Sequence, residues 1–281
     1  MKAGKQTTLC DEASVSGIGV HSGSPVTLTL HPADAGTGIV FLRTGLPGRS
    51  DCEIRADVRA VTATEFATVL GDDDGPLCAT AEHVLAALAG LGVDNAVVEV
   101  DGPEVPIMDG SAEAFVAAID HAGIRSLDAP RRYLKVLKPV RVRQGRSVGE
   151  ILPNSRGLRL EIDIEFDHPL IGRQRCALDV SPTNFRRELA RARTFGFMRD
   201  VAKLWSTGYA LGALRIGQRR LVLDPSAPGR AAAAAIAAGL GAELLADRPP
   251  ALDMADKGAS RRLEDWLRVR TTPGDSGSGL G

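Results

Sequence analysis

The residues that could do chemistry begin with an adjacent carboxylate and imidazole, Glu82 and His83, in the segment 80–92. Apolar residues follow this pair at helical spacing, Thr80 is a suitable N-cap, and Gly92 is a stop signal. The sequence therefore predicts a helix whose first turn carries a base and a metal ligand, where the helix dipole favours a carboxylate. Taken alone, however, the pair is better explained as an exposed glutamate and a surface histidine on an ordinary amphipathic helix.

The composition of the whole chain excludes several classes of protein. The 281 residues are enough for two domains, and a net charge of −1 argues against a nucleic-acid partner or an anionic membrane surface. No apolar run approaches the roughly 20 residues of a transmembrane helix, and the N-terminus lacks the apolar core of a signal peptide. Four cysteines without CxxC spacing are expected to be free thiols, so we expect a cytoplasmic protein.

The first half of the chain reads as an α+β domain over residues 5–124. Alternating apolar residues predict strands, and helical spacing predicts a second helix that starts at Gly110 or Ser111. The acidic run 72–74 is better explained as a solvated turn than as a cation site. We interpret His21, in a glycine-flanked turn, as a structural or surface residue. The strands expected in this half are 26–30, 39–43 and 95–100.

The second half repeats the order of strands followed by helices. The polar residues 125–132 are predicted to be a linker, and residues 133–213 a second α+β domain. Ser181 before Pro182 predicts the start of a helix through Arg193, and a short helix is expected over 198–206. Residues 214–281 form a divergent tail, rich in alanine and then in glycine and serine, that is expected to be partly disordered. The strands expected in this half are 133–142, 147–152, 158–166 and 174–180.

Several long motifs resemble one enzyme family. Glu82-His83, the run Leu91–Asn95 and the run Pro103–Ala112 closely resemble UDP-3-O-acyl-N-acetylglucosamine deacetylase, the zinc amidohydrolase of lipid A synthesis in Gram-negative bacteria. The segments Val20–Gly23 and Arg191–Asp200 match the same family, and the resemblance extends from about Lys5 to Gly212.

The resemblance implies both a fold and a reaction. The fold would be two topologically related α+β domains, each a β-sheet with a helix pair, with the helices sandwiched between the sheets. The reaction would be zinc-dependent hydrolysis of the N-acetyl group of UDP-3-O-acyl-N-acetylglucosamine, with water as co-substrate. A monomer is expected.

The same resemblance implies roles for individual residues. A catalytic zinc ion takes three protein ligands and lowers the pKa of bound water from about 15.7 toward 7. His83 matches the first zinc ligand and Glu82 the general base, while Thr194 matches the hydroxyl that stabilises the oxyanion. Phe195 matches an aromatic beside the sugar. Residues at the family's acyl-chain passage, which pattern alone would assign to the core, are Phe197, Val201, Leu204 and Ala210. Residues at its nucleotide and glucosamine contacts, which the pattern fits equally well as surface or core, are Arg146, Glu165, Phe166 and Asp200.

The sequence departs from the family in its last quarter. The family takes its other two zinc ligands from a His-Lys-x-x-Asp helix and its general acid from a later histidine, but this chain has no histidine after His168. We therefore expect an incomplete second domain. Two functions remain open: an active zinc deacetylase, or a catalytically impaired relative that still binds the nucleotide sugar. An unrelated structural module would require the motif matches to be coincidence.

The composition changes abruptly at about Ala213. One hypothesis is that the gene is read out of frame from that point. The alternative is a genuine divergent tail. The coding DNA, together with the intact mass of the protein, distinguishes the two.

Overall fold

The computed structural model describes residues 4–46, 48, 50–167, 171–197 and 204–212. Its first half is built on a five-stranded sheet in the order β2-β3-β9-β4-β5, in which β4 and β9 are parallel and the other neighbours antiparallel. The strands are β2 (Ala13–Ile18), β3 (Pro25–Pro32), β4 (Ile39–Arg43), β5 (Cys52–Arg55) and β9 (Ala96–Val100).

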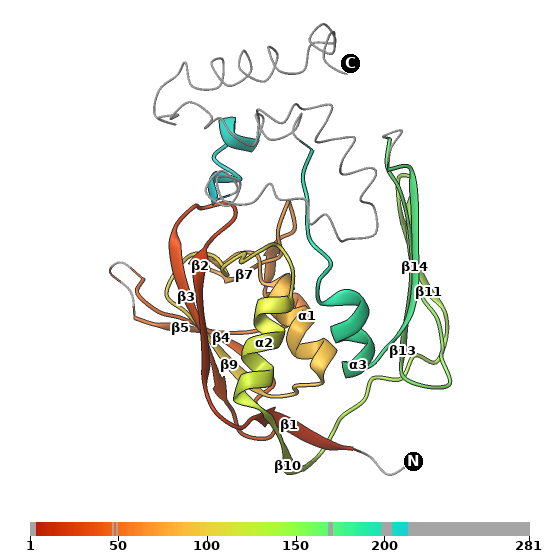
Figure 1. Ribbon diagram of the computed structural model, residues 1–281, viewed down its shortest axis with the longest axis horizontal. Helices are drawn as coiled ribbons and strands as arrows, with labels where there is room; N and C mark the ends of the chain where they lie inside the picture. The colour runs from red at the N-terminus through yellow and green to blue at the C-terminus, as the bar shows by residue number, and fades with distance from the viewer. Residues whose placement is uncertain (1–3, 47, 49, 168–170, 198–203, 213–281) are drawn as a thin grey trace, which may run out of the picture.

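Two helices, α1 (Glu82–Leu91) and α2 (Glu113–Ala122), lie side by side over one face of this sheet (Figure 1). Alternation on β3 turns Val26, Leu28 and Leu30 toward the helices, and all three are buried. The apolar stripe of α1 completes the core with Val84, Ala87, Leu88 and Leu91. The expected strands of the first half and the existence of both helices are therefore confirmed. The start of the second helix, predicted at Gly110 or Ser111, lies at Glu113, whose N–H donates to the Ser111 hydroxyl.

A smaller three-stranded sheet connects the large sheet to α1. It consists of β6 (Val61–Ala63), β7 (Val69–Asp72) and β8 (Gly75–Cys78), preceded by the 3₁₀ turn η1 (Val58–Ala60). The acidic run 72–74 is exposed and forms the turn between β7 and β8. Within the described residues, no cluster of three or more His, Cys, Asp or Glu side chains is arranged to hold a metal ion. The exposure of its three carboxylates agrees with the interpretation of the run as a solvated turn.

The segment predicted to be a linker, 125–132, contains a strand. β10 (Ile124–Pro130) pairs antiparallel with β1 (Lys5–Leu9) and so ties this segment to the N-terminus. The polar composition misled the prediction, because the strand buries little and is specified by its partner. Arg131 strengthens the junction by donating to Asp94 Oδ2 at 2.8 Å and to the Gly92 carbonyl at 2.7 Å. The domain boundaries themselves stay predictions.

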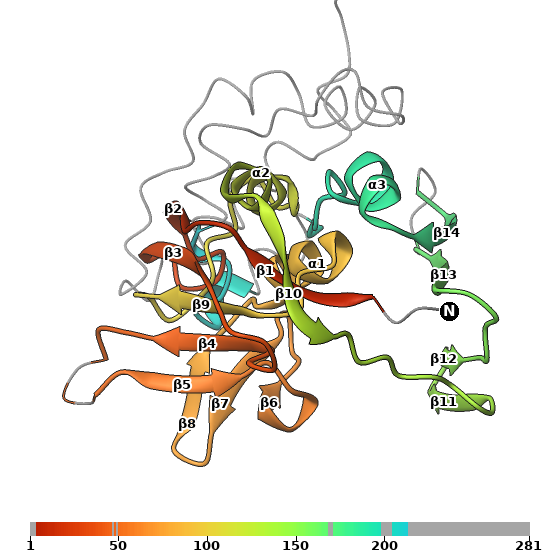
Figure 2. The ribbon, with the colours of Figure 1, turned by 90° about the horizontal axis from the view of Figure 1, so that it is seen from below.

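The second half consists of two hairpins and a short helical unit. β11 (Val140–Gln144) pairs with β12 (Ser147–Ile151), and β13 (Leu158–Glu165) pairs with β14 (Arg173–Val180). The helical unit is α3 (Pro182–Asn184), capped by the Ser181 side chain as predicted, and it continues as the π-helical turn η2 (Phe185–Leu189). Figures 1 and 2 show α1, α2 and α3 between the five-stranded sheet and the two hairpins, the sandwich that the resemblance implied.

Two boundaries in this half were predicted wrongly. The strand expected over 133–142 begins only at Val140, and the helix expected through Arg193 ends at Leu189. Of the short helix expected over 198–206, only residues 204–206 are described, and they are helical. Within the described part, no helix is long and apolar enough to cross a membrane.

The hairpins of the second half leave their apolar sides uncovered. Ile162 and Ile164 project from one side of β13, 46% and 45% exposed, while Asp163 on the other side pairs with Arg173 and Arg175. Such an amphipathic ribbon normally buries its apolar side against another element. The exposure agrees with the expectation that part of the second domain's core is unformed.

Gly90 determines how closely the second half approaches α1. A Cβ at this position would overlap the ring of the buried Phe185, with Cδ1 at 2.7 Å. Only a glycine lets the η2 turn lie directly on the α1 backbone.

We expect Gly90→Ala to lower the free energy of unfolding by about 1 kcal/mol. Displacing the Phe185 ring costs about 2 kcal/mol, which outweighs the roughly 1 kcal/mol that alanine gains over glycine in a helix. Chemical denaturation measures the difference. The control is Gly149→Ala on β12, where an added Cβ meets no atom within 4 Å. Equal stabilities of the two variants would contradict this account of the contact.

Candidate functional site

A buried carboxylate, Glu104, organises the residues around the start of α1. Glu104 is only 1% exposed. Its carboxylate accepts hydrogen bonds from the His21 N–H at 3.1 Å, the Ser22 N–H at 2.8 Å and the Thr80 hydroxyl at 2.7 Å. A buried charge is tolerated only when it is satisfied in this way. Glu104 therefore joins the turn after β2 to the residue that precedes α1.

This contact explains why the N-cap predicted at Thr80 is wrong. Thr80 has a left-handed backbone with φ +59°, and its hydroxyl donates to Glu104 instead of accepting from the helix. The helix begins at Glu82 after Ala81, which makes no side-chain capping bond. The predicted end is confirmed, because Gly92 is left-handed with φ +79° and donates to the last turn.

Glu82 and His83 lie in the first turn of α1, and both are half-buried. Glu82 Oε2 accepts a hydrogen bond from the Thr68 N–H at 2.9 Å, which fixes the carboxylate against the loop between β6 and β7. In the described part of the chain, the His83 ring makes no hydrogen bond. The pair is thus more enclosed than the exposed glutamate and surface histidine of an ordinary helix.

His21, which the sequence analysis interpreted as a structural or surface residue, is half-buried beside the loop that contacts Glu82. Its Nε2 lies 3.3 Å from the carbonyl oxygen of Phe66, in the same loop that donates to Glu82. Its Nδ1 is buried and has no hydrogen-bond partner in the described part, and its ring meets the Tyr209 ring edge-on at 5.3 Å. The sequence signal for this position was the motif Val20–Gly23, which is one of the segments that resemble the family.

Thr194 is attached to the loop that precedes α2. Its N–H donates to the Gly110 carbonyl at 2.9 Å, and the neighbouring Arg193 pairs with Asp109 at 3.0 Å. Burial raises the pKa of Asp109, but hydrogen bonds from Ser111 and Arg193 outweigh it and hold the pKa below its usual value. No hydrogen bond or ion pair joins Thr194 directly to Glu82 or His83 in the described residues.

Three of the predicted substrate residues form one aromatic cluster. The ring centroids of Phe166, Phe195 and Phe197 lie 5.5–6.2 Å apart, and Phe195 remains 59% exposed. Edge-to-face contacts of this kind stabilise rings while leaving one face available for stacking. Arg146 and Glu165, also predicted at the nucleotide, form an exposed ion pair at 4.0 Å.

Of the four remaining predicted residues, two are described. Leu204 and Ala210 lie on the segment 204–212, where the Trp205 indole donates to the Ala210 carbonyl at 3.0 Å. Asp200 and Val201 lie outside the described residues. Because Val201 is among the residues that are not described, the acyl passage of Phe197, Val201, Leu204 and Ala210 stays a prediction.

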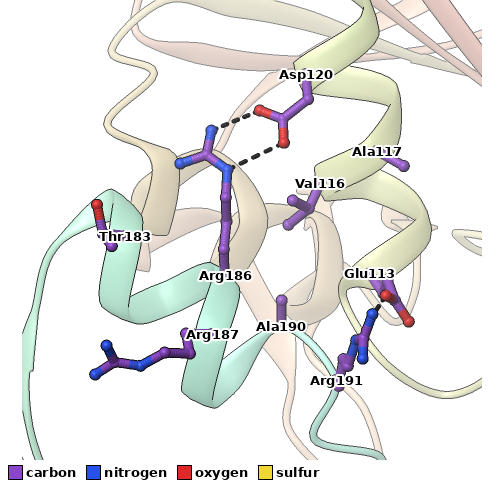
Figure 3. Close-up of a pocket in the computed structure, with 9 residues that line it drawn as sticks. All are labelled: Glu113, Val116, Ala117, Asp120, Thr183, Arg186, Arg187, Ala190 and Arg191. Atoms are coloured by element: carbon purple, nitrogen blue, oxygen red, sulfur yellow. Dashed lines mark hydrogen bonds and ion pairs between the residues drawn. The ribbon is translucent and has the colours of Figure 1, made fainter.

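A cavity of about 590 Å³ lies between α2 and η2, away from these residues (Figure 3). Its guanidinium groups are already engaged, Arg186 by Asp120 and Arg191 by Glu113. Because carboxylates neutralise these cations, the cavity has no evident preference for an anion. Burial also raises the pKa of the Cys78 thiol to about 12, which disfavours the nucleophilic thiolate at neutral pH.

Comparisons with known proteins identify the family. The family model described as UDP-3-O-acyl N-acetylglycosamine deacetylase (LpxC) matches residues 6–226. The chain is similar to proteins named UDP-3-O-acyl-N-acetylglucosamine deacetylase from Brucella ovis, Brucella canis and Brucella suis. Each is 47% identical over 208 residues, which is 74% of this chain and 71% of the relative.

We expect Glu104→Gln to destabilise the protein by about 2–4 kcal/mol. An amide would replace one acceptor oxygen by a donor that faces the N–H groups of His21 and Ser22, and buried polar groups would lose their partners. Thermal or chemical unfolding measures the loss. Glu99→Gln is the control, since Glu99 is half-buried and binds only the side chain of His31. A loss no larger than in that control would contradict the central role of Glu104.

Proposed function

The chain belongs to the LpxC family of UDP-3-O-acyl N-acetylglycosamine deacetylases, and from this we propose that it removes the N-acetyl group of UDP-3-O-acyl-N-acetylglucosamine by hydrolysis. The reaction would serve lipid A biosynthesis, with water as co-substrate, in a cytoplasmic monomer. The observation that supports it best is the placement of Glu82 and His83 together in the first turn of a rigid helix.

Glu82 is suited to act as general base. One of its oxygens is fixed by the Thr68 N–H, and the other makes no hydrogen bond in the described residues, so it is free to accept a proton from a water molecule. The fixed oxygen orients the carboxylate before substrate binds. Such preorganisation is part of what a positioned base contributes.

Thr194 and Phe195 would contribute from the second half of the chain. A hydroxyl donor beside the scissile amide stabilises the oxyanion of the tetrahedral intermediate, a contribution of about 3 kcal/mol in comparable sites. Phe195 leads the exposed aromatic cluster, whose rings would stack on the sugar or the nucleobase. The backbone at this point is attached to the loop before α2, because Arg193 pairs with Asp109 and the Thr194 N–H donates to the Gly110 carbonyl.

Zinc is the cofactor that family membership implies, and the described residues do not fit a complete zinc site. A catalytic zinc ion needs three protein ligands. His83 offers one imidazole, and no group of three candidate ligands occurs in the described part of the chain. The sequence also has no histidine after His168 to complete such a site or to protonate the leaving amine.

This mismatch supports a second candidate function: a catalytically impaired family member that still binds the nucleotide sugar. The aromatic cluster and the Arg146–Glu165 pair, which would contact the substrate, do not depend on a metal. The alignment with the Brucella relatives also leaves 29% of their length unmatched. An out-of-frame tail after about residue 213 would account for that loss.

Zinc content and acetate release distinguish the two candidates. We expect Glu82→Gln to lower any acetate release by about 100-fold or more, because the base is removed while the shape is kept. Glu99→Gln serves as the control outside the site. Stoichiometric zinc with turnover supports the deacetylase. A zinc-free chain that binds the nucleotide sugar without turnover supports the impaired relative.

We expect Phe195→Ala to weaken binding of UDP-3-O-acyl-N-acetylglucosamine by about 10-fold. The exposed ring would lose a stacking contact of roughly 1–1.5 kcal/mol. Calorimetric titration measures this without any catalysis. Tyr133→Ala is the matched control, because Tyr133 is 67% exposed and lies outside the cluster. Unchanged affinity in the Phe195 variant would remove the cluster from the substrate site.

A further inference from the structure

The segment 190–194 runs along the loop 109–113, and this seam joins the two halves of the chain. Two backbone hydrogen bonds of 2.9 Å hold it, from the Ala112 N–H to the Ala190 carbonyl and from the Thr194 N–H to the Gly110 carbonyl. These bonds also explain why the helix predicted through Arg193 ends early. Ala190 and Ala192 still donate to carbonyls of their own preceding turn, but the Ala190 carbonyl accepts from Ala112 and the Thr194 N–H donates to Gly110.

Two ion pairs flank these bonds, and they differ in how firmly they are held. Asp109 accepts from the Ser111 hydroxyl at 2.6 Å and from Arg193 through both Nε and Nη2, at 3.2 and 3.0 Å. The carboxylate is thus anchored in its own loop before it binds the guanidinium. The other pair, Arg191 with Glu113 at 2.8 Å, has its arginine 78% exposed and contributes little restraint.

Gly110 brings the threonine directly onto the loop. It is buried with φ +87°, and a Cβ there would lie 3.7 Å from Thr194 Cγ2. The absence of a side chain at Gly110 leaves room for Thr194, whose N–H bonds to the Gly110 carbonyl. The hydroxyl projects from this part of the backbone, so its position depends on how firmly the backbone of Thr194 is held there.

We propose that Asp109 is a positioning residue: its ion pair with Arg193 fixes Thr194 against Gly110 and so presets the Thr194 hydroxyl. Asp109 itself acts only through Arg193 and the backbone of the seam. The catalytic consequence rests on the proposed function, in which Thr194 stabilises the oxyanion. The mechanical part, the restraint of Thr194, does not depend on it.

The direct test is hydrogen exchange of the Thr194 amide, followed by NMR on the full chain. Asp109→Asn keeps the shape of the side chain and removes its charge, and we expect exchange to become about 5-fold faster, the order expected for loss of a half-buried ion pair. Glu113→Gln breaks the neighbouring pair on the same seam and should leave the rate unchanged. An unchanged rate in Asp109→Asn, or an equal increase in the control, would overturn the proposal.

A second variant, at Arg193, controls for misfolding of the first and tests the coupling between Asp109 and Arg193. Arg193→Gln should produce the same increase, and the double variant should add nothing, because the two side chains act as one unit. Additive increases would show that they act separately and would overturn the proposal.

Where the parent protein releases acetate, Asp109→Asn should lower kcat and leave KM unchanged. A parent without acetate release refutes the proposed function, while the exchange experiment still decides the role of Asp109.

Discussion

The buried carboxylate of Glu104 is the interaction on which the candidate site depends. A charge in the core must collect its hydrogen bonds from wherever the backbone can supply them, and Glu104 takes them from the turn at His21 and from Thr80. Gly19 makes room, because a Cβ there would overlap the carboxylate. The buried carboxylate thus holds the backbone just before α1, while the apolar stripe of the helix packs in the core.

A second consequence concerns the loop between β6 and β7. It is held at one end by Glu82, through the Thr68 N–H, and near its middle by His21, through the Phe66 carbonyl. Phe66 takes a left-handed backbone with φ +63°, a strained conformation for a residue of its size. Strain of this kind persists where several contacts determine the position, and it gathers at functional sites.

The two halves of the molecule are unequally complete. The first half buries a continuous core between its sheet and two helices, whereas the hairpins of the second half expose apolar side chains such as Ile162 and Ile164. The halves meet where Phe185 rests on Gly90 and where the seam at Gly110 holds Thr194. Glu82 and His83 therefore lie on the well-packed half, and the aromatic cluster lies on the half with the smaller core.

The sequence by itself determined the elements whose signals are local. The alternation of β3 and β13, the stripe of α1, the glycine at its end and the Ser181-Pro182 start all appear as predicted, since each depends on neighbours within a few residues. The motifs around Glu82 and Gly110 were also sufficient to indicate the family. The tertiary structure alone decided what depends on distant partners. Thr80 donates to a glutamate 24 residues away, and most of the segment 125–132 forms a strand through pairing with β1. His21 contacts the loop that also bonds to Glu82. A linear pattern does not encode these contacts, because each arises only when the core brings remote segments together.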